Sequence, residues 1–238
     1  MSTVSMADTI GADAGNIPAS FAKVAGYDTG GGSVPWSMTM WDRFPTSGHV
    51  HIDQSPGLTV YGDSHGAIVA DVEPGAGTIA NFVVQTMARH ARGQWGHVYC
   101  SFDTAPLVVG ALLAQKVDIA RVDFWLANWN LSQSEASQMV GTYDLSIPGH
   151  GTVQIEVSAV QWASPSSNPH TLLPGSTLTL QQSNVDLSET RPDWFAYVPP
   201  KPPPVPTTET GIVVYENGGF KTVPVISHDS GKTWLQGS

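Results

Sequence analysis

Two carboxyl groups lie at the end of an apolar run and have a spacing suited to acid and base chemistry. The run 67–70 leads into Asp71, Val72 and Glu73, and the turn residues Pro74 and Gly75 follow. Alternate residues of a strand share one face, so Asp71 and Glu73 are expected roughly 6–7 Å apart at their Cα atoms. Neighbouring acids push their pKa values apart, which gives one protonated and one ionised carboxyl group. The pair alone also fits a solvated acidic strand end.

Two further acids extend this pattern. The segment 23–28 reads as a short strand that ends in Asp28, and Asp186 lies in the late segment 184–187. Four carboxyl groups at strand ends favour a functional site over a solvated edge. Asp53 ends another strand, 49–53, but the sequence that follows it is equally typical of a turn, so Asp53 is a candidate of second rank.

Aromatic side chains near these acids are candidates for binding a sugar ring. Tyr27 precedes Asp28, and we assign it to substrate binding with Trp129 and Trp162. Trp129 follows the strand 121–127 and is expected in a loop, where stacking on a sugar is possible. Trp125 lies in the middle of that strand and is expected in the core.

Composition excludes several classes of protein. Charged residues make up 13% of the 238 residues, hydrophobic residues make up 41%, and the formal net charge is −10, so a packed globular protein without a nucleic-acid surface is expected. A single cysteine, Cys100, excludes a disulfide framework. His49 and His51 have no third ligand in the pattern, so neither a metal nor another cofactor is predicted. No nucleophile elbow supports acyl transfer.

The order of elements predicts an α/β barrel. Expected strands at 23–28, 49–53, 67–73, 97–100 and 121–127 alternate with expected helices at 36–44, 78–92, 106–115 and from Ser132. This alternation indicates a parallel sheet, and acids at the carboxyl ends of strands favour a TIM-like (β/α) barrel over a doubly wound sheet. After residue 152, the segments 153–162 and 176–182 alternate apolar and polar residues, so strands without helices are expected to close the barrel.

The chain divides into four predicted parts. Residues 1–20 are small and polar and are interpreted as a flexible or partner-ordered arm. The barrel is expected over 21–197, a proline-rich linker over 198–208, and a small β-hairpin tail over 209–238. The tail segment 227–234 resembles the Asp-box of sialidase-type propellers, which has a structural role in that family.

Five short segments together resemble the family 25 glycoside hydrolases, which are muramidases. They are Gly26-Tyr27-Asp28, Asp71-Val72-Glu73, Trp125-Leu126-Ala127, the segment 160–164 and the segment 184–187, in the order in which the family has them. The resemblance implies an acidic groove for the glycan of peptidoglycan. It further implies that Glu73 is the general acid and that Asp71 orients the substrate amide or stabilises developing charge. Asp28 and Asp186 would line the same groove.

The resemblance also implies a reduced barrel, because residues 23–195 are fewer than the ~200 usual for this fold. We therefore expect one strand-helix unit to be missing or reduced. The N-terminus lacks the pattern of a secretory signal, and no apolar run is long enough to span a membrane. A hydrolase of bacterial cell walls without a signal indicates a phage protein made in the host cytoplasm, and either present in the virion or released at lysis.

Two functions are consistent with these observations. The first is a phage virion-associated enzyme that hydrolyses peptidoglycan or another cell-surface glycan. The second is an inactive barrel that serves as a structural, decoration or glycan-binding protein of a phage head or tail. In either case the N-terminal arm and the C-terminal tail are expected to contact other phage structural proteins, and no membrane or nucleic-acid partner is expected.

Overall fold

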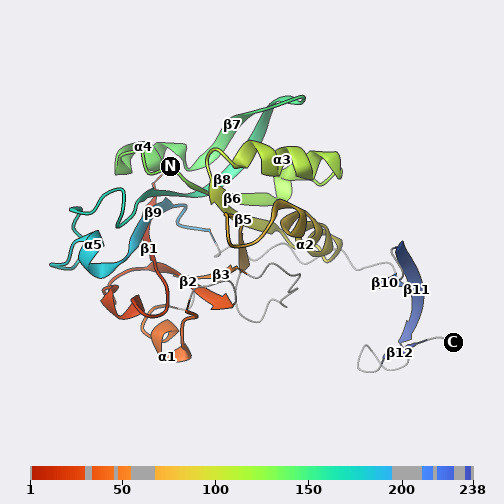
Figure 1. Cartoon of the computed structure of the whole chain (residues 1–238), viewed down its shortest axis with the longest axis horizontal. Helices are drawn as coiled ribbons and strands as arrows, with labels where there is room; N and C mark the ends of the chain where they lie inside the picture. Colours follow the sequence, from red (N-terminus) through yellow and green to blue (C-terminus); the bar gives the residue numbers. More distant parts are fainter. Residues whose placement is uncertain are drawn as a thin grey trace. The chain divides into compact units, whose positions relative to one another are not determined.

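A computed structural model describes residues 2–29, 34–45, 48–54 and 68–194 of one compact unit, Met1–Pro199, and three strands of a second unit, Pro200–Ser238. The first unit contains a nine-stranded sheet that closes into a barrel of eight strands (Figure 1). Its strands are β1 (Val4–Asp8), β2 (Lys23–Thr29), β3 (His49–Asp53), β4 (Ile68–Asp71), β5 (Gly96–Ser101), β6 (Val122–Ala127), β7 (Gly141–Ile147), β8 (Gly151–Ala163) and β9 (Asp186–Thr190).

The barrel combines parallel and antiparallel pairing. Strands β1 to β6 are neighbours in chain order and all run parallel, and β6 pairs in parallel with β8. Strand β9 is antiparallel to both β8 and β1, and this double pairing closes the barrel. Strand β7 forms an antiparallel hairpin with β8 and lies outside the closed ring. The fold is therefore a closed, mixed barrel of the α/β type.

Helices cover only part of the outer surface. The described helices are α1 (Met38–Trp41), α2 (Ile79–Ala91), α3 (Ala105–Ala114), α4 (Gln133–Met139) and α5 (Leu180–Ser183), with short 3-10 turns η1 (Ala14–Asn16) and η4 (Ile119–Arg121). Figure 1 shows α2 and α3 side by side near β5 and β6, and α4 near the N-terminus. Two helix starts expected from the sequence have side-chain caps: Thr78 caps α2, and Ser132 and Glu135 form a capping box on α4. Among the described helices, none is long and apolar enough to cross a membrane.

Large side chains fill the barrel interior. Met6, Tyr99, Trp125 and Trp194 belong to one buried cluster in which Trp125 and Trp194 are each only 1% exposed. The indole nitrogen of Trp125 donates a hydrogen bond to Ser188 Oγ at 3.0 Å. The expectation that Trp125 is a core residue is confirmed. Such a filled interior confines any binding site to an end of the barrel.

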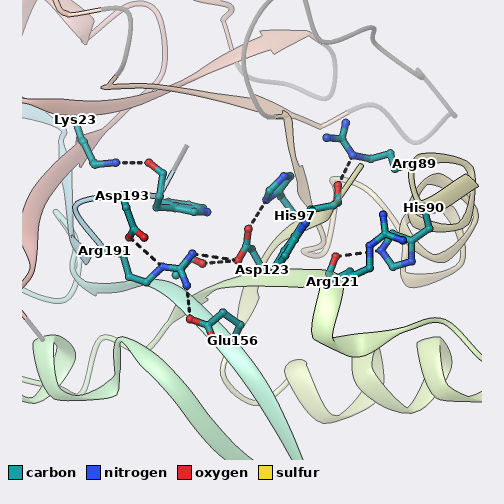
Figure 2. A network of polar contacts seen from close by, with 12 residues as sticks. Lys23, Arg89, His90, His97, Arg121, Asp123, Glu156, Arg191 and Asp193 are labelled. Carbon is teal, nitrogen blue, oxygen red and sulfur yellow. Dashed lines mark hydrogen bonds and ion pairs between the residues drawn. The ribbon is translucent and has the colours of Figure 1, made fainter. Parts of the chain in front are cut away.

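Charged side chains close the end of the barrel where the parallel strands begin (Figure 2). Arg191 is paired with Glu156 and lies 3.6 Å from a carboxylate oxygen of Asp123. His97 Nδ1 lies 3.0 Å from Asp123 as well. Burial alone would raise the pKa of Asp123, but His97, Ser158 and Arg191 together hold it below its ordinary value. The charges at this end are therefore compensated by opposite charges and hydrogen bonds.

Residues 1–20 were expected to be a flexible or partner-ordered arm, and this expectation is wrong for residues 4–8. Residues Val4–Asp8 form β1, which pairs with β2 and β9, and Met6 and Ala7 are fully buried. The sequence was expected to lack one strand-helix unit of a barrel that begins at residue 23. Strand β1, which precedes residue 23 in the chain, supplies an additional strand of the barrel. The error arose because Val4–Asp8 is short and contains only a few strongly apolar residues.

A second error concerns the closing strands. Residues 176–182 were expected to be a strand, but they form a turn and then α5, for which Thr179 and Gln182 make a capping box. Hydroxyl and amide side chains that satisfy backbone groups at a helix start favour this local structure over a strand. The strand that closes the barrel is β9, directly after this helix. The predicted strand 153–162 is confirmed as part of β8.

The second unit is a three-stranded antiparallel sheet. Strand β10 (Gly211–Glu216) pairs with β11 (Gly219–Ser227), which pairs with β12 (Trp234–Gln236). The expected hairpin is therefore present. The predicted linker 198–208 and most of the Asp-box-like segment, 228–233, lie outside the described residues.

A buried carboxylate attaches β1 to the rest of the barrel. Glu189 on β9 is 3% exposed. Its oxygens accept hydrogen bonds from Thr3 Oγ1 at 2.6 Å, Ser5 Oγ at 2.7 Å, Gln133 Nε2 at 2.8 Å and Ser137 Oγ at 3.3 Å. These donors come from the N-terminal segment and from α4. Glu189 therefore joins three separate segments of the chain.

Replacing Glu189 by leucine should destabilise the barrel, since it removes the shared acceptor of four hydrogen bonds, three of them from half-buried hydroxyl groups. We expect the free energy of unfolding to fall by about 2–4 kcal/mol. Glu189→Gln retains one acceptor oxygen and should lose less. Urea denaturation followed by circular dichroism measures both variants, and an unchanged midpoint for Glu189→Leu would contradict this role.

Candidate functional site

Four carboxyl groups lie together at the end of the barrel where the parallel strands finish. Asp8 is the last residue of β1, and it is the direct pairing partner of Asp186, the first residue of β9. Asp71 ends β4 and is paired with Tyr99 of β5, while Glu73 follows two residues later. Antiparallel β9 begins where parallel β1 ends, so the closing strand brings Asp186 to the same end as the other acids.

A cavity of about 380 Å³ opens at this end. Its described lining comes from β1, β2, β5, β8 and β9 and from the loops beside them: Asp8, Thr9, Ile10, Tyr27, Glu73, Tyr99, Trp129, Gln161, Ser164, Pro165, Ser166, Asn184 and Asp186. Asp71 is buried on the inner face next to this lining, and its carboxyl group interacts electrostatically with both Glu73 and Asp8. The cavity has the size of a site for a small ligand or for part of a chain.

The side-chain amide of Gln161 connects the parts of the site. Its Oε1 accepts hydrogen bonds from Tyr99 Oη at 2.8 Å and from Trp129 Nε1 at 3.0 Å. Its Nε2 lies 3.2 Å from Asp8 Oδ2 and donates to that carboxyl group. Two donors on the oxygen and an acceptor beside the nitrogen fix the orientation of the amide. Gln161 thereby holds the rim residue Trp129 in a defined relation to the acids.

Burial raises the pKa values of the acids beside the cavity. For Glu73, desolvation by burial and then the charge of Asp71 raise the pKa to about 7, against a smaller opposing effect of the Tyr99 hydroxyl. For Asp71, burial raises the pKa to about 6, although a hydrogen bond from Gln54 Nε2 at 3.0 Å favours the ionised form. At neutral pH the site therefore has a proton available on Glu73 while Asp71 is mostly ionised.

The pair formed by Asp8 and Asp186 is still more strongly affected. Burial raises the pKa of Asp8 to about 7, with the hydrogen bond from Gln161 opposing and the charges of Glu73 and Asp71 adding to the increase. Burial and the adjacent charges of Asp8 and Glu73 raise the pKa of Asp186 well above its ordinary value. Two facing carboxyl groups cannot both ionise readily in such a place, so they share protons at neutral pH.

The structure brings three of the four predicted catalytic acids together. Asp71, Glu73 and Asp186 meet at the cavity, but Asp28 does not line it. Tyr27 faces the cavity, so the next residue along β2 faces outward, where Asp28 Oδ1 lies 2.7 Å from His51 Nδ1. The placement of Asp28 in the groove is therefore wrong, and Asp8 occupies the position expected for it.

Some of the predicted sugar-binding residues line the cavity and others do not. Tyr27 and Trp129 line the cavity, and Trp129 is 41% exposed. Trp162 follows Gln161 on β8 and packs instead against the outer hydrophobic clusters. Asp53 pairs with Ala70 on the face of the sheet opposite to Ile52, and it is not among the residues that line the cavity. Neither Trp162 nor Asp53 is therefore placed to contact a ligand there.

Sequence reasoning missed Asp8, Gln161 and Tyr99. Asp8 follows Met6 and Ala7, which repeats on a smaller scale the pattern of an apolar segment ending in an acid that identified Asp71. Gln161 lies within the segment quoted for the family resemblance, but its amide gave no chemical signal in isolation. Tyr99 lies in the expected strand 97–100, where no feature of the sequence marks its hydroxyl group as part of a site.

His49 and His51 both contact neighbouring residues of the first unit. His51 stacks on Trp41 with ring centroids 4.3 Å apart, and His49 Nε2 lies 3.0 Å from the carbonyl oxygen of Phe44. Within the residues that the structure describes, no three His, Cys, Asp or Glu side chains are arranged to hold a metal ion. The four acids are accordingly considered as proton donors, acceptors and fixed charges.

Comparisons with protein-family models, with curated proteins and with solved structures each returned no match. The geometry of the cavity and the chemistry of its lining are therefore the basis for assigning a function.

Replacing Asp8 by asparagine should alter how stability depends on pH. The folded state holds the Asp8 proton up to about pH 7, whereas an unfolded aspartate loses it near its ordinary value of 3.8. The contribution of Asp8 is thus complete below about pH 4 and is lost as pH rises through 7. The amide introduced by Asp8→Asn cannot ionise, so the variant should gain about 4 kcal/mol relative to wild type between pH 4 and pH 8.

Urea denaturation at a series of pH values measures this difference. Asp144→Asn, which removes an exposed carboxylate on β7, controls for the general effect of one less negative charge. A constant difference between Asp8→Asn and wild type across the range would contradict the proposed burial of an ionisable group.

Proposed function

We propose that this protein is a glycoside hydrolase that cleaves a glycan in the cavity at the carboxyl end of the barrel. The observation that carries the proposal is the adjacent pair Asp71 and Glu73, whose pKa values are raised to about 6 and about 7 beside an open cavity of about 380 Å³. Hydrolysis of a glycosidic bond requires a carboxylic acid near the leaving oxygen and a carboxylate near the developing positive charge. The pair supplies both at neutral pH.

In the proposed reaction, Glu73 donates its proton to the glycosidic oxygen as the bond to the leaving sugar breaks. Asp71 remains ionised and stabilises the positive charge that develops on the sugar, directly or by orienting an amide substituent of the substrate. Burial strengthens this electrostatic effect, because Asp71 is only 2% exposed and little water screens it. A water molecule then forms a bond from its oxygen to the anomeric carbon and gives a proton to the Glu73 carboxylate, which restores the acid.

Asp8 and Asp186 contribute to the same chemistry. The acids raise one another's proton affinity: Asp71 and Glu73 raise the pKa of Asp8, and Glu73 raises that of Asp186. Trp129, held by Gln161 at the rim, offers an exposed indole face on which a sugar ring can stack. These contacts support a carbohydrate substrate over a small charged metabolite.

We further propose the finer identity that the sequence resemblance implies. The barrel would be a reduced TIM-like (β/α) barrel related to the family 25 glycoside hydrolases, with the peptidoglycan glycan as substrate and a phage virion as its location. The parallel run β1 to β6 and the acids at the strand ends support this relation. An inactive barrel that binds glycans in a phage particle is the outcome that a failed activity test would favour.

Glu73→Gln should abolish hydrolysis while leaving the fold intact. The amide has the size of the acid but cannot donate a proton to the glycosidic oxygen, so we expect kcat to fall by about 10²–10⁴-fold. Release of reducing ends from purified peptidoglycan measures the activity, and circular dichroism checks the fold. Wild-type protein that releases no reducing ends from several wall types would overturn the proposed function.

Activity should depend on pH with a maximum between about pH 6 and pH 7. As pH falls through about 6, Asp71 gains a proton and its charge is lost. As pH rises through about 7, Glu73 loses the proton that it must donate. A plot of kcat/KM against pH measures both limits, which belong to the coupled group of acids. A constant rate from pH 5 to pH 8 would show that these carboxyl groups do not act in the rate-limiting step.

A further inference from the structure

We infer that the cavity selects a glycan with a free amino group, in which an ammonium group lies against Asp186 and the carboxyl groups beside it. This inference rests on the proposed function in one respect, since it takes the same cavity as the sugar-binding site. It narrows that function by assigning a positive charge to the preferred sugar, so that within the proposed glycan the preferred residues are those whose amino group carries no acetyl group. Three properties of the cavity support it: the charge of the lining, the polar atoms left without a partner, and the direction of the available hydrogen bonds.

The described lining has several acids and no positive counterpart, so any charge that it acquires by ionisation is negative. Among the described residues that line the cavity, none is Lys, Arg or His. The titratable groups that face the site from each element are Asp8 on β1, Tyr27 on β2, Asp71 on β4, Glu73 after it, Tyr99 on β5 and Asp186 on β9. A sugar with a carboxylate would be repelled here, and an ammonium group would be attracted.

Two carboxylate oxygens at the site are buried and have no hydrogen-bond partner in the described part of the chain. They are Oδ1 of Asp186, which lines the cavity, and Oδ1 of Asp71, whose side chain is almost completely buried. Buried polar atoms normally have a partner, and exceptions concentrate at sites that bind something. An ammonium group carries three donors and a positive charge, so it can satisfy more than one such oxygen at once.

Most hydrogen-bond donors of the lining are already used within the protein. Tyr99 and Trp129 donate to Gln161, and Gln161 donates to Asp8. Thr9 donates to the carbonyl oxygen of Asn184, and Asn184 Nδ2 donates to Asp13. Ser164 and Ser166 share one hydrogen bond. Once its carboxyl groups are ionised, the wall therefore offers a ligand mainly acceptors. This favours a donor-rich substituent such as an ammonium over the carbonyl oxygen of an acetamido group.

The same geometry predicts that binding is linked to proton release. The carboxyl groups of the empty site hold protons near neutral pH, because burial raises the pKa values of Asp8, Glu73 and Asp186. A cation placed beside them favours their ionised forms and lowers those pKa values again. Binding of an amino sugar at pH 6.5 should therefore release protons to the buffer, while binding of the neutral N-acetylated sugar should not.

The test compares two tetrasaccharides of the same length, one of glucosamine and one of N-acetylglucosamine. Isothermal titration calorimetry uses the full chain with Glu73→Gln, so that neither ligand is hydrolysed during the measurement. We expect the glucosamine tetramer to bind ~10-fold or more tightly than the N-acetylated one, as a charge-assisted pair provides. Titration in buffers of different ionisation enthalpy should detect proton release for the glucosamine tetramer alone.

Variants separate the local effect from general attraction to an acidic protein. Adding Asp186→Asn to Glu73→Gln should abolish the preference for the glucosamine tetramer. Asp8→Asn in the same background serves if the first variant does not fold. Adding Asp144→Asn, which removes an exposed charge, should leave the preference unchanged.

Equal affinities for the two tetramers, tighter binding of the N-acetylated one, or a preference unaffected by Asp186→Asn would each overturn the inference. These outcomes are independent of catalysis, because binding is measured without cleavage. A protein that binds the glucosamine tetramer but hydrolyses no glycan would retain this inference and lose the proposed function.

Discussion

The site depends on the burial of several carboxyl groups in a place where the described lining has no cation to balance them. Asp8, Asp71 and Asp186 are drawn into the barrel by the alternation of residues along β1, β4 and β9, since the neighbours of each residue face the opposite side of the sheet. Their proximity makes ionisation of all of them unfavourable, and the acids accordingly hold protons at pH values where exposed acids do not. Burial is thus the source of their raised proton affinity.

At the opposite end of the barrel, buried charged groups have partners of opposite charge or hydrogen bonds. Arg191 lies among Asp123, Glu156 and Asp193, and buried Lys23 donates a hydrogen bond to the carbonyl oxygen of Trp194. Burial lowers the pKa of Lys23 to about 8, but its hydrogen bond gives the ammonium group a partner. At the end with Arg191, opposite charges and hydrogen bonds balance the buried charges. At the end with the cavity, no cation of the described lining balances the acids. This difference distinguishes a structural network from a candidate site.

Local signals in the sequence predicted much of the fold, and the errors have physical causes. Thr78, Pro106 and the pair Ser132 and Glu135 define helix starts through contacts within a few residues, and all three helices are present. The strand Val4–Asp8 gave a weak local signal because its stability comes from pairing with β9 and from the hydrogen bonds to Glu189, near the other end of the first unit. Asp8 was not predicted because the strand that it ends is recognised only through its distant partners. Asp71 and Glu73 were predicted because a strongly apolar strand precedes them.

The order of the strands has a consequence for the time at which the site comes into existence. Strand β1 is the first of the barrel to be synthesised, and its partner β9 is the last. Contacts between such distant segments are slow to form, and they require nearly the whole first unit to be present. Asp8 and Asp186 can therefore meet only after β9 has been synthesised, so that a shorter nascent chain has no assembled group of acids.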